Sequence, residues 1–166
     1  PDGSVPGDKI SAYCEEYDRM ARNLDMLVIG MGEAGQVGFN EAGTTPSSRT
    51  RTVLLSYQSR KRQGKNFNGD FKHTPSEAIT VGIDTMMSAK KIILMAWGED
   101  KANAVKQVVE HKADSDFPAS FLQNHKDITC YVDETAASLL TRVVSPWLVG
   151  PCEWTRKFIR KAVVWL

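Results

Sequence analysis

The stretch DMLVIGMGEAGQVGFNEAGTTPSSRTR, residues 25–51, decides how the rest of the chain is interpreted. Its apolar run, residues 26–29, predicts a buried strand, and glycines follow at once at positions 30, 32 and 35. Beyond them come the carboxylate of Glu41 and the guanidinium groups of Arg49 and Arg51. Because ligands of open α/β sheets lie at the carboxyl ends of the strands, this glycine-rich loop is a candidate binding site.

The same glycines fit the G-x-G-x-x-G pattern of dinucleotide-binding loops. In that pattern the third glycine opens a helix whose N-terminus holds the pyrophosphate. Here Gly35 is followed by Gly38 and by a turn rich in glycine, threonine and proline, which are poor helix formers. The acidic residue expected about 20 positions after the strand is also missing. The sequence therefore disfavours a dinucleotide site.

Helices and strands alternate along the rest of the chain. Apolar residues in steps of three and four predict helices over residues 9–23, 99–111 and 133–144, with Asp8 as the N-cap of the first. Shorter helices are expected at 56–65, 85–89 and 117–124. Short apolar runs predict strands at 26–29, 49–55, 78–83, 91–98 and 127–132. This alternation predicts an open α/β fold with a mostly parallel sheet flanked by helices.

Composition narrows the classes of function. The chain has 166 residues, 42% hydrophobic and 25% charged, which suits one domain with a packed core. A net charge of +1 gives no field that would attract nucleic acid, and no apolar run approaches the ~18 residues of a membrane span. Three cysteines without C-x-x-C spacing predict a reduced, cytoplasmic chain. The three histidines lack metal-ligand spacing, so no metal site is expected.

Two charged residues are candidates for chemistry on their own. Glu41 beside the glycines could act as a general acid or base, or it could be an exposed loop glutamate. Lys101 follows a predicted strand and lies in the first turn of a predicted helix, where its charge opposes the helix dipole. A bound phosphate would offset that cost, although an ordinary surface lysine remains the alternative.

The segment after Val144 differs from the rest of the chain. PWLVGPCEW, residues 146–154, holds two prolines and two tryptophans, and a helix is expected to follow with Trp154, Phe158 and Trp165 on one face. Large apolar groups of this kind need a partner. Because the chain begins in a polar loop without Met and ends on an apolar run, we expect a fragment cut at both ends. The tail, residues 146–166, is expected to pack on this domain or on a further one.

Two stretches of the sequence resemble the glucosamine-6-phosphate deaminase/isomerase family. They are GMGEAGQVGFNEAG with SRTR downstream, and AITVGIDTMMSAKKIILMAWGEDKA, and the similarity runs from residue 12 to about residue 144. The resemblance implies a Rossmann-like fold, oligomerisation, and conversion of glucosamine 6-phosphate to fructose 6-phosphate and ammonia without metal or cofactor. It also implies that residues 1–145 are the C-terminal part of the family's domain, truncated at the N-terminus. The tail lies where longer bacterial relatives continue into a further domain.

The resemblance also assigns roles to the glycine loop. The family's loop reads D-G-H-x-x-F-N-E, and residues 34–41 align with it. Its Asp, His and Glu together open the sugar ring; here Glu41 is kept, whereas Ala34 and Gln36 replace the Asp and the His. Glutamine cannot exchange a proton near neutral pH, so ring opening is expected to be impaired. The Asp that transfers a proton between C1 and C2 lies in the family's N-terminal half, which this chain lacks, so the chain alone is expected to be inactive.

The phosphate-binding positions are better preserved. Lys101 matches the family's phosphate-binding lysine, and Lys65 stands where the family has an arginine, keeping the charge but losing the bidentate fork. Thr44 and Arg51 match an allosteric phosphate site of some members, although Val53 replaces a further basic residue there. The resemblance therefore implies a phosphorylated amino sugar as partner.

Three hypotheses remain open. The chain is a deaminase/isomerase domain (hydrolase class) of amino-sugar metabolism that acts within a longer chain, with altered chemistry. Alternatively it is a non-catalytic sensor of a phosphorylated amino sugar. In the third hypothesis it is a structural domain whose tail holds a partner domain. A homo-oligomer, or docking to further domains of a longer chain, is expected in each case.

Overall fold

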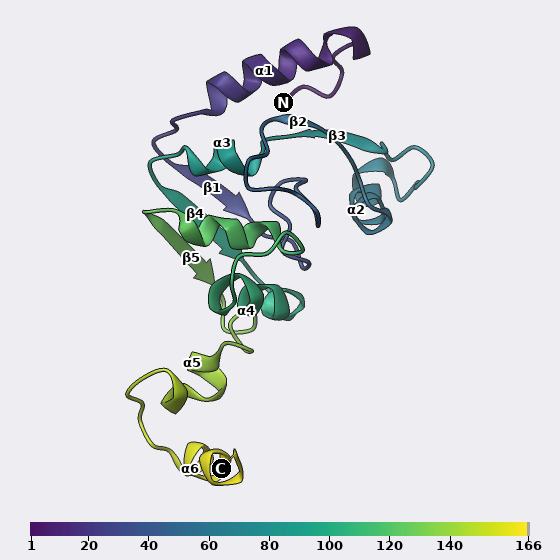
Figure 1. Cartoon of the computed structure of the whole chain (residues 1–166). Helices are drawn as coiled ribbons and strands as arrows, with labels where there is room; N and C mark the ends of the chain where they lie inside the picture. The colour runs from purple at the N-terminus through teal and green to yellow at the C-terminus, as the bar shows by residue number, and fades with distance from the viewer. Residues whose placement is uncertain (166) are drawn as a thin grey trace.

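The computed structural model describes residues 1–165, which are built around a three-stranded parallel sheet (Figure 1). Its strands are β1 (Leu27–Gly30), β4 (Ile92–Ala96) and β5 (Ile128–Val132), and β4 lies in the middle. Leu27 is paired with Ile92, which is paired with Ile128. The open α/β fold with a parallel sheet and flanking helices, predicted from the alternation of elements, is confirmed.

One face of this sheet carries the core. In β4 the alternate residues Ile92, Leu94 and Ala96 are at most 2% exposed, as expected for the inner face of a strand. The helices α3 (Ile83–Met87) and α4 (Ala102–Glu110) and the 3-10 helix η4 (Pro118–Asn124) contribute the side chains packed against them. Their buried residues in this core are Ile83, Met86, Ala104, Val105, Val108, Ala119 and Leu122.

The opposite face of the sheet is open. Val28 of β1 and Tyr131 of β5 point to this side and are 53% and 56% exposed. β1 also stands at one end of the strand order, so one of its edges has no neighbouring strand among residues 1–165. The sheet is therefore open at this edge and on this face.

A second, two-stranded sheet is antiparallel and separate from the first. It pairs β2 (Arg51–Leu54) with β3 (Glu77–Thr80), and the connection contains α2 (Tyr57–Gln63) and the 3-10 helix η2 (Gly64–Phe67). The sequence predicted both strands but not their separation from the parallel sheet. This pair lies beside α2 and away from β5 (Figure 1).

Two predicted helix boundaries were wrong. Asp8 lies inside the 3-10 helix η1 (Gly7–Lys9), and α1 (Ile10–Ala21) begins after it with Lys9 at the N-cap position. The helix predicted over 133–144 is reduced to α5 (Thr141–Val144). Before it the chain forms turns: the Asp133 carboxylate accepts a hydrogen bond from the Ala136 N–H at 2.7 Å, and the Leu140 N–H donates to the Ala137 carbonyl at 3.0 Å.

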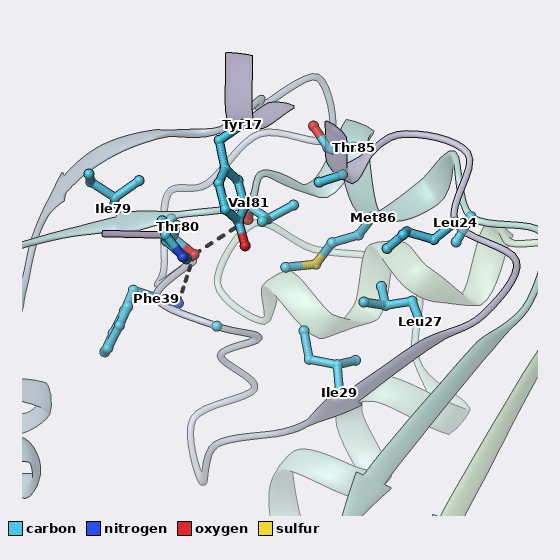
Figure 2. A pocket seen from close by; sticks show the side chains of 14 residues that line it. Tyr17, Leu24, Leu27, Ile29, Phe39, Ile79, Thr80, Val81, Thr85 and Met86 are labelled. Atoms are coloured by element: carbon cyan, nitrogen blue, oxygen red, sulfur yellow. Dashed lines mark hydrogen bonds between the residues drawn. The ribbon is translucent and has the colours of Figure 1, made fainter. Parts of the chain in front are cut away.

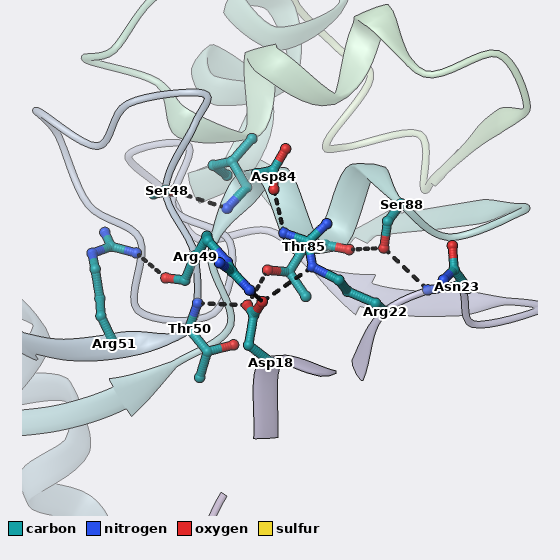
Figure 3. Close-up of polar contacts among 11 residues, drawn as sticks. Asp18, Arg22, Asn23, Ser48, Arg49, Thr50, Arg51, Asp84, Thr85 and Ser88 are labelled. Carbon is teal, nitrogen blue, oxygen red and sulfur yellow. Dashed lines mark hydrogen bonds and ion pairs between the residues drawn. The ribbon is translucent and has the colours of Figure 1, made fainter. Parts of the chain in front are cut away.

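A buried carboxylate ties α1 to the rest of the molecule (Figure 3). Asp18 is 1% exposed and accepts hydrogen bonds from the Thr50 backbone N–H at 2.9 Å and from Arg49 Nη2 at 2.7 Å. Arg22 Nε, at 3.1 Å, and the Thr85 hydroxyl also donate to it. Asp18 thereby links α1, the segment leading into β2, and α3.

The same contacts set the protonation state of Asp18. Burial by itself would raise the pKa of this carboxyl group. The hydrogen bonds from Thr85, Thr50 and Arg49 outweigh burial and hold the pKa of Asp18 well below its usual range. The group is therefore a charged carboxylate with a full set of donors, which is how a buried charge is tolerated.

The tail extends away from both sheets (Figure 1). It contains the 3-10 helix η5 (Pro146–Leu148) and α6 (Arg156–Trp165), and Leu166 lies outside the described residues. Trp147 stacks on Trp154 and meets the edge of Phe158, each with ring centroids 5.9 Å apart. Trp165, however, is 62% exposed, so the predicted apolar face is only partly covered. None of the helices between residues 1 and 165 has the length and apolar character needed to span a bilayer.

Candidate functional site

The loop after β1 is fixed to the junction between β3 and α3. The Phe39 backbone N–H donates to the Thr80 hydroxyl at 3.1 Å. Asn40, which is fully buried, donates from Nδ2 to the Val81 carbonyl at 2.7 Å. Gly35 has a φ of +71°, and a Cβ at this position would lie 2.9 Å from the Phe117 ring. This glycine therefore serves close packing and backbone geometry, and not the approach of a dinucleotide.

Gln36 points back into its own loop. Its Oε1 accepts a hydrogen bond from the Ala34 backbone N–H at 3.0 Å, and a Cβ on Gly32 would lie 2.1 Å from that oxygen. The Gln36 side chain thus stabilises the loop. Neither Ala34 nor Gln36 offers a group that titrates near neutral pH.

Glu41 is held at the start of α2. Its carboxylate accepts a hydrogen bond from the Ser56 backbone N–H at 3.2 Å. Ser56 is the N-cap of α2, and its hydroxyl accepts from the Ser59 N–H at 3.2 Å. A carboxylate at a helix N-terminus is favourably placed, so this contact fixes the position of Glu41.

Thr44 and Arg51 lie together with Glu41 around a cavity of about 220 Å³. Arg51 Nη1 donates to Asn40 Oδ1 at 3.0 Å, and Nη2 lies 3.4 Å from the Thr44 hydroxyl. Burial lowers the pKa of the Arg51 guanidinium. Within residues 1–165 its hydrogen-bond acceptors are neutral, so its charge lacks a carboxylate partner. The structure thus brings three of the predicted site residues together.

Lys101 lies in a tight turn after β4. Gly98 begins this turn with a φ of +93°, and its N–H donates to the Asp133 carboxylate at 3.2 Å. The Lys101 ammonium pairs with Asp100, and its side chain is only 17% exposed. Lys101 is therefore held close to the protein surface at the carboxyl end of the central strand.

Asp133 is a residue that sequence reasoning missed. It directly follows β5, and it fixes the turn that carries Lys101 through Gly98. The hydrogen bond from the Ala136 N–H, together with that from Gly98, holds the pKa of Asp133 below its usual range. An aspartate directly after a strand was the available signal, because the carboxyl ends of parallel strands share one edge of the sheet.

Arg62 was also missed. It lies in the last turn of α2 and forms an ion pair with Glu33 in the glycine loop. Lys65, a candidate phosphate-binding residue from the sequence, is exposed in η2, and no hydrogen bond or ion pair of its side chain is found within residues 1–165. Its predicted role in phosphate binding stays a prediction.

A larger cavity of about 330 Å³ lies elsewhere, between α1, β1, β3 and α3 (Figure 2). Tyr17, Leu24 and Met86 are among its lining residues, and the lining contains no carboxylate, lysine or arginine side chain. An apolar cavity of this kind does not suit a sugar phosphate, which needs charged donors. Residues 1–165 also hold no group of three His, Cys, Asp or Glu residues placed to bind a metal ion.

These features define an open α/β domain whose charged side chains gather in the loops beyond the carboxyl ends of its strands. A family model described as glucosamine-6-phosphate isomerases/6-phosphogluconolactonase matches residues 2–131. The chain therefore belongs to this family.

Individual relatives agree with that assignment. A glucosamine-6-phosphate deaminase-like protein of Bacteroides thetaiotaomicron is 41% identical over 169 residues, which cover all of this chain and 25% of that protein. The glucosamine-6-phosphate deaminase of Bacillus velezensis is 41% identical over 140 residues, 82% of this chain and 57% of the enzyme. The chain thus spans between a quarter and three fifths of these relatives.

Solved structures give the same result. A monomeric glucosamine-6-phosphate deaminase has a TM-score of 0.78 and 38% identity, and the match covers 84% of this chain and 58% of that one. A 6-phosphogluconolactonase of Trypanosoma cruzi has a TM-score of 0.59 at 18% identity, covering 84% of this chain and 56% of that one. The second likeness shows a shared fold alone.

Proposed function

We propose that this chain is a glucosamine-6-phosphate deaminase/isomerase-like domain of amino-sugar metabolism, with an impaired ring-opening step. It binds a phosphorylated amino sugar in the loops beyond β1 and β4. The deaminases at 38–41% identity support the substrate class. On this proposal no metal or organic cofactor takes part.

The observation that carries the proposal is the Lys101 turn. The Lys101 side chain is only 17% exposed and lies at the carboxyl end of the central strand, where its ammonium group can bind a phosphate by charge. The backbone of the turn is fixed by Asp133, so the cation is held before the ligand arrives. Such preorganisation lowers the entropic cost of binding.

The impairment follows from the glycine loop. Glu41 is the remaining candidate acid or base, and Gln36 is engaged with the loop backbone. Proton transfer during ring opening needs a group whose pKa lies near the working pH, and an amide has none. The expected result is binding with little or no release of ammonia.

Arg51 favours a second candidate function, a sensor that binds the sugar phosphate without converting it. Its partly buried guanidinium beside Thr44 has only neutral acceptors within residues 1–165, so an anion in the adjoining cavity would supply the missing charge. A sensor needs this binding and no turnover.

The tail supports a proposal on domain organisation. The shorter deaminases of Bacillus subtilis and Listeria welshimeri align with 84% and 78% of this chain, whereas the longer Bacteroides relative aligns with all of it. We therefore propose that residues 1–145 are part of the deaminase-like domain. Residues 146–166 then pack against a further domain or a second copy of the chain, within a cytoplasmic protein.

The test is to incubate the full chain with glucosamine 6-phosphate and to measure ammonia and fructose 6-phosphate, with calorimetry in parallel. We expect binding without normal turnover, and an affinity about 10-fold lower or worse for Lys101→Ala. Lys126→Ala, an exposed lysine outside the site, is the matched control and should bind like the wild type. Normal turnover would contradict the impairment, and binding unaffected by Lys101→Ala would contradict the site.

A further inference from the structure

The last turn of α2 carries three basic residues with different surroundings. Arg60 is used structurally: it donates to the Thr74 carbonyl at 2.9 Å and lies 4.2 Å above the Phe71 ring. Lys61 is exposed to solvent. Arg62 instead reaches across to the glycine loop and pairs with Glu33. Of the three, only Arg62 is connected to the candidate site.

The topology places this ion pair next to the Lys101 turn. β1 and β4 are neighbouring parallel strands, with Gly30 paired to Met95, and the Met31 N–H donates to the Met95 carbonyl at 2.9 Å. The loop with Glu33 and the turn with Lys101 therefore leave the sheet side by side. The charge of Arg62 also contributes, after the hydrogen bond from Lys101, to holding the pKa of Asp100 below its usual range.

Each of the two cations is paired with a carboxylate that solvent reaches easily. The side chains of Glu33 and Asp100 are 42% and 57% exposed. Exposed ion pairs contribute little to stability, so they are readily exchanged for a better partner. A phosphate dianion is such a partner, because its oxygens can accept two parallel hydrogen bonds from a guanidinium and a further one from an ammonium.

We propose that Arg62 and Lys101 together bind the phosphate group of the substrate, and that Glu33 and Asp100 hold these cations until the ligand replaces them. This inference rests on the proposed function, since it concerns the same phosphate. Lys65 cannot form the bidentate contact of an arginine. On this proposal Arg62, one turn earlier, supplies it. Glu33 then acts as an internal competitor of the phosphate.

The experiment is calorimetry on the full chain with glucosamine 6-phosphate as ligand and glucosamine as the probe without phosphate. Arg62→Ala is expected to weaken glucosamine 6-phosphate binding about 10-fold or more, because one charged bidentate contact is lost. Lys61→Ala, the adjacent exposed residue, is the matched control and should leave the affinity unchanged. Glu33→Gln should tighten binding several-fold, because the competing carboxylate is removed.

The two variants of the ion pair separate ligand binding from a structural role. If the pair only held the loop in place, Glu33→Gln and Arg62→Ala would weaken binding alike, and the inference would be wrong. Arg62→Lys keeps the charge and should recover part of the affinity, which keeps the test decisive if Arg62→Ala unfolds. An equal loss of glucosamine affinity in Arg62→Ala would also contradict a phosphate contact.

Lys101→Ala distinguishes this inference from the proposed function. If Lys101→Ala loses phosphate-dependent binding while Arg62→Ala binds like the wild type, only the role of Arg62 is overturned. If the wild-type chain shows no difference between glucosamine 6-phosphate and glucosamine, both the function and the inference are overturned.

Discussion

The loop after β1 and the turn after β4 leave the sheet at the same edge, but they offer different groups to a ligand. The loop is fixed by its backbone: Asn40 is buried and hydrogen-bonded, and the Glu41 carboxylate accepts a hydrogen bond from the Ser56 N–H. At positions 34 and 36 it has alanine and glutamine, neither of which titrates near neutral pH. The turn instead offers a cation, Lys101. The difference indicates that binding charge and proton-transfer groups are separate features, which neighbouring loops of one sheet can carry independently.

The largest expected effect comes from removing the buried carboxylate that supports the segment next to Arg51. Asp18→Ala leaves Arg49 and the Thr50 N–H without their acceptor, and Arg51, next in the chain, would lose its position beside the loop. Breaking a buried charge network of this kind typically costs about 3–5 kcal/mol. We expect that loss in the free energy of unfolding, measured by urea denaturation. Asp25→Ala, which removes an exposed ion pair with Lys90, is the control and should be nearly neutral.

The same carboxylate predicts a dependence of stability on pH. Because its pKa is depressed in the folded chain, its contribution is complete above the unfolded value of about 4. It is lost progressively as the pH falls from there towards the folded pKa. The wild type should therefore lose stability below about pH 4 more steeply than Asp18→Asn, and parallel curves would contradict the assignment.

The next effect tests whether positions 34 and 36 limit ring opening. Introducing Ala34→Asp and Gln36→His together should speed ring opening of glucosamine 6-phosphate, followed by NMR as exchange between its anomers, about 100-fold over the wild-type chain, a typical gain from a positioned acid or base. Adding Glu41→Gln to the pair should abolish the gain, since the three groups act together. An unchanged rate in the double variant would show that the loop does not place these side chains against the sugar.

A smaller effect tests the backbone of the loop. Gly35→Ala places a Cβ 2.9 Å from the Phe117 ring at a φ of +71°, and both the contact and the backbone strain are unfavourable. We expect a loss of about 1–3 kcal/mol in thermal or urea unfolding. Gly7→Ala, whose Cβ would meet no atom within 4 Å, is the control. Equal stability of the two variants would mean that the loop rearranges freely.

The smallest effect should come from the tail. Trp147→Ala removes the centre of the cluster with Trp154 and Phe158, and its aromatic contribution to circular dichroism should disappear. Since the cluster is made within the tail, the free energy of unfolding of residues 1–145 should change by no more than about 0.5 kcal/mol. Phosphate binding should not change. A large shift would show that the tail packs on the sheets.

Much of the fold follows from the sequence because short apolar runs specify buried strands locally. The runs at 26–29 and 91–98 became β1 and β4, with ends that differ by one or two residues. The helix predicted over 133–144 is limited to its last turn, α5, and Asp133 instead bonds to Gly98, 35 residues away, and to the turn that follows it. Such a long-range contact leaves no periodic signal in the sequence.

In the candidate site, too, local features can be predicted from the sequence and long-range contacts cannot. Glu41, Thr44 and Arg51, which the resemblance assigns to two different sites, lie around one cavity because all three belong to one continuous stretch. Arg62 and Asp133 could not be found from a continuous motif, because each contacts a segment that is distant in the sequence. Position in a motif predicts residues that share a loop, but it does not predict which neighbouring helix reaches that loop.

The free edge of β1 has a consequence for hydrogen exchange. The Leu27 and Met31 amides donate to the Lys91 and Met95 carbonyls of the neighbouring segment, at 2.8 and 2.9 Å. In a parallel strand the amides alternate in direction, so the Val28 amide points away from β4, towards the edge that has no neighbouring strand among residues 1–165. Amides along β1 should therefore exchange with deuterium alternately slowly and quickly, whereas the central strand β4 should be protected throughout. That alternation would report, residue by residue, whether anything is bound along this edge.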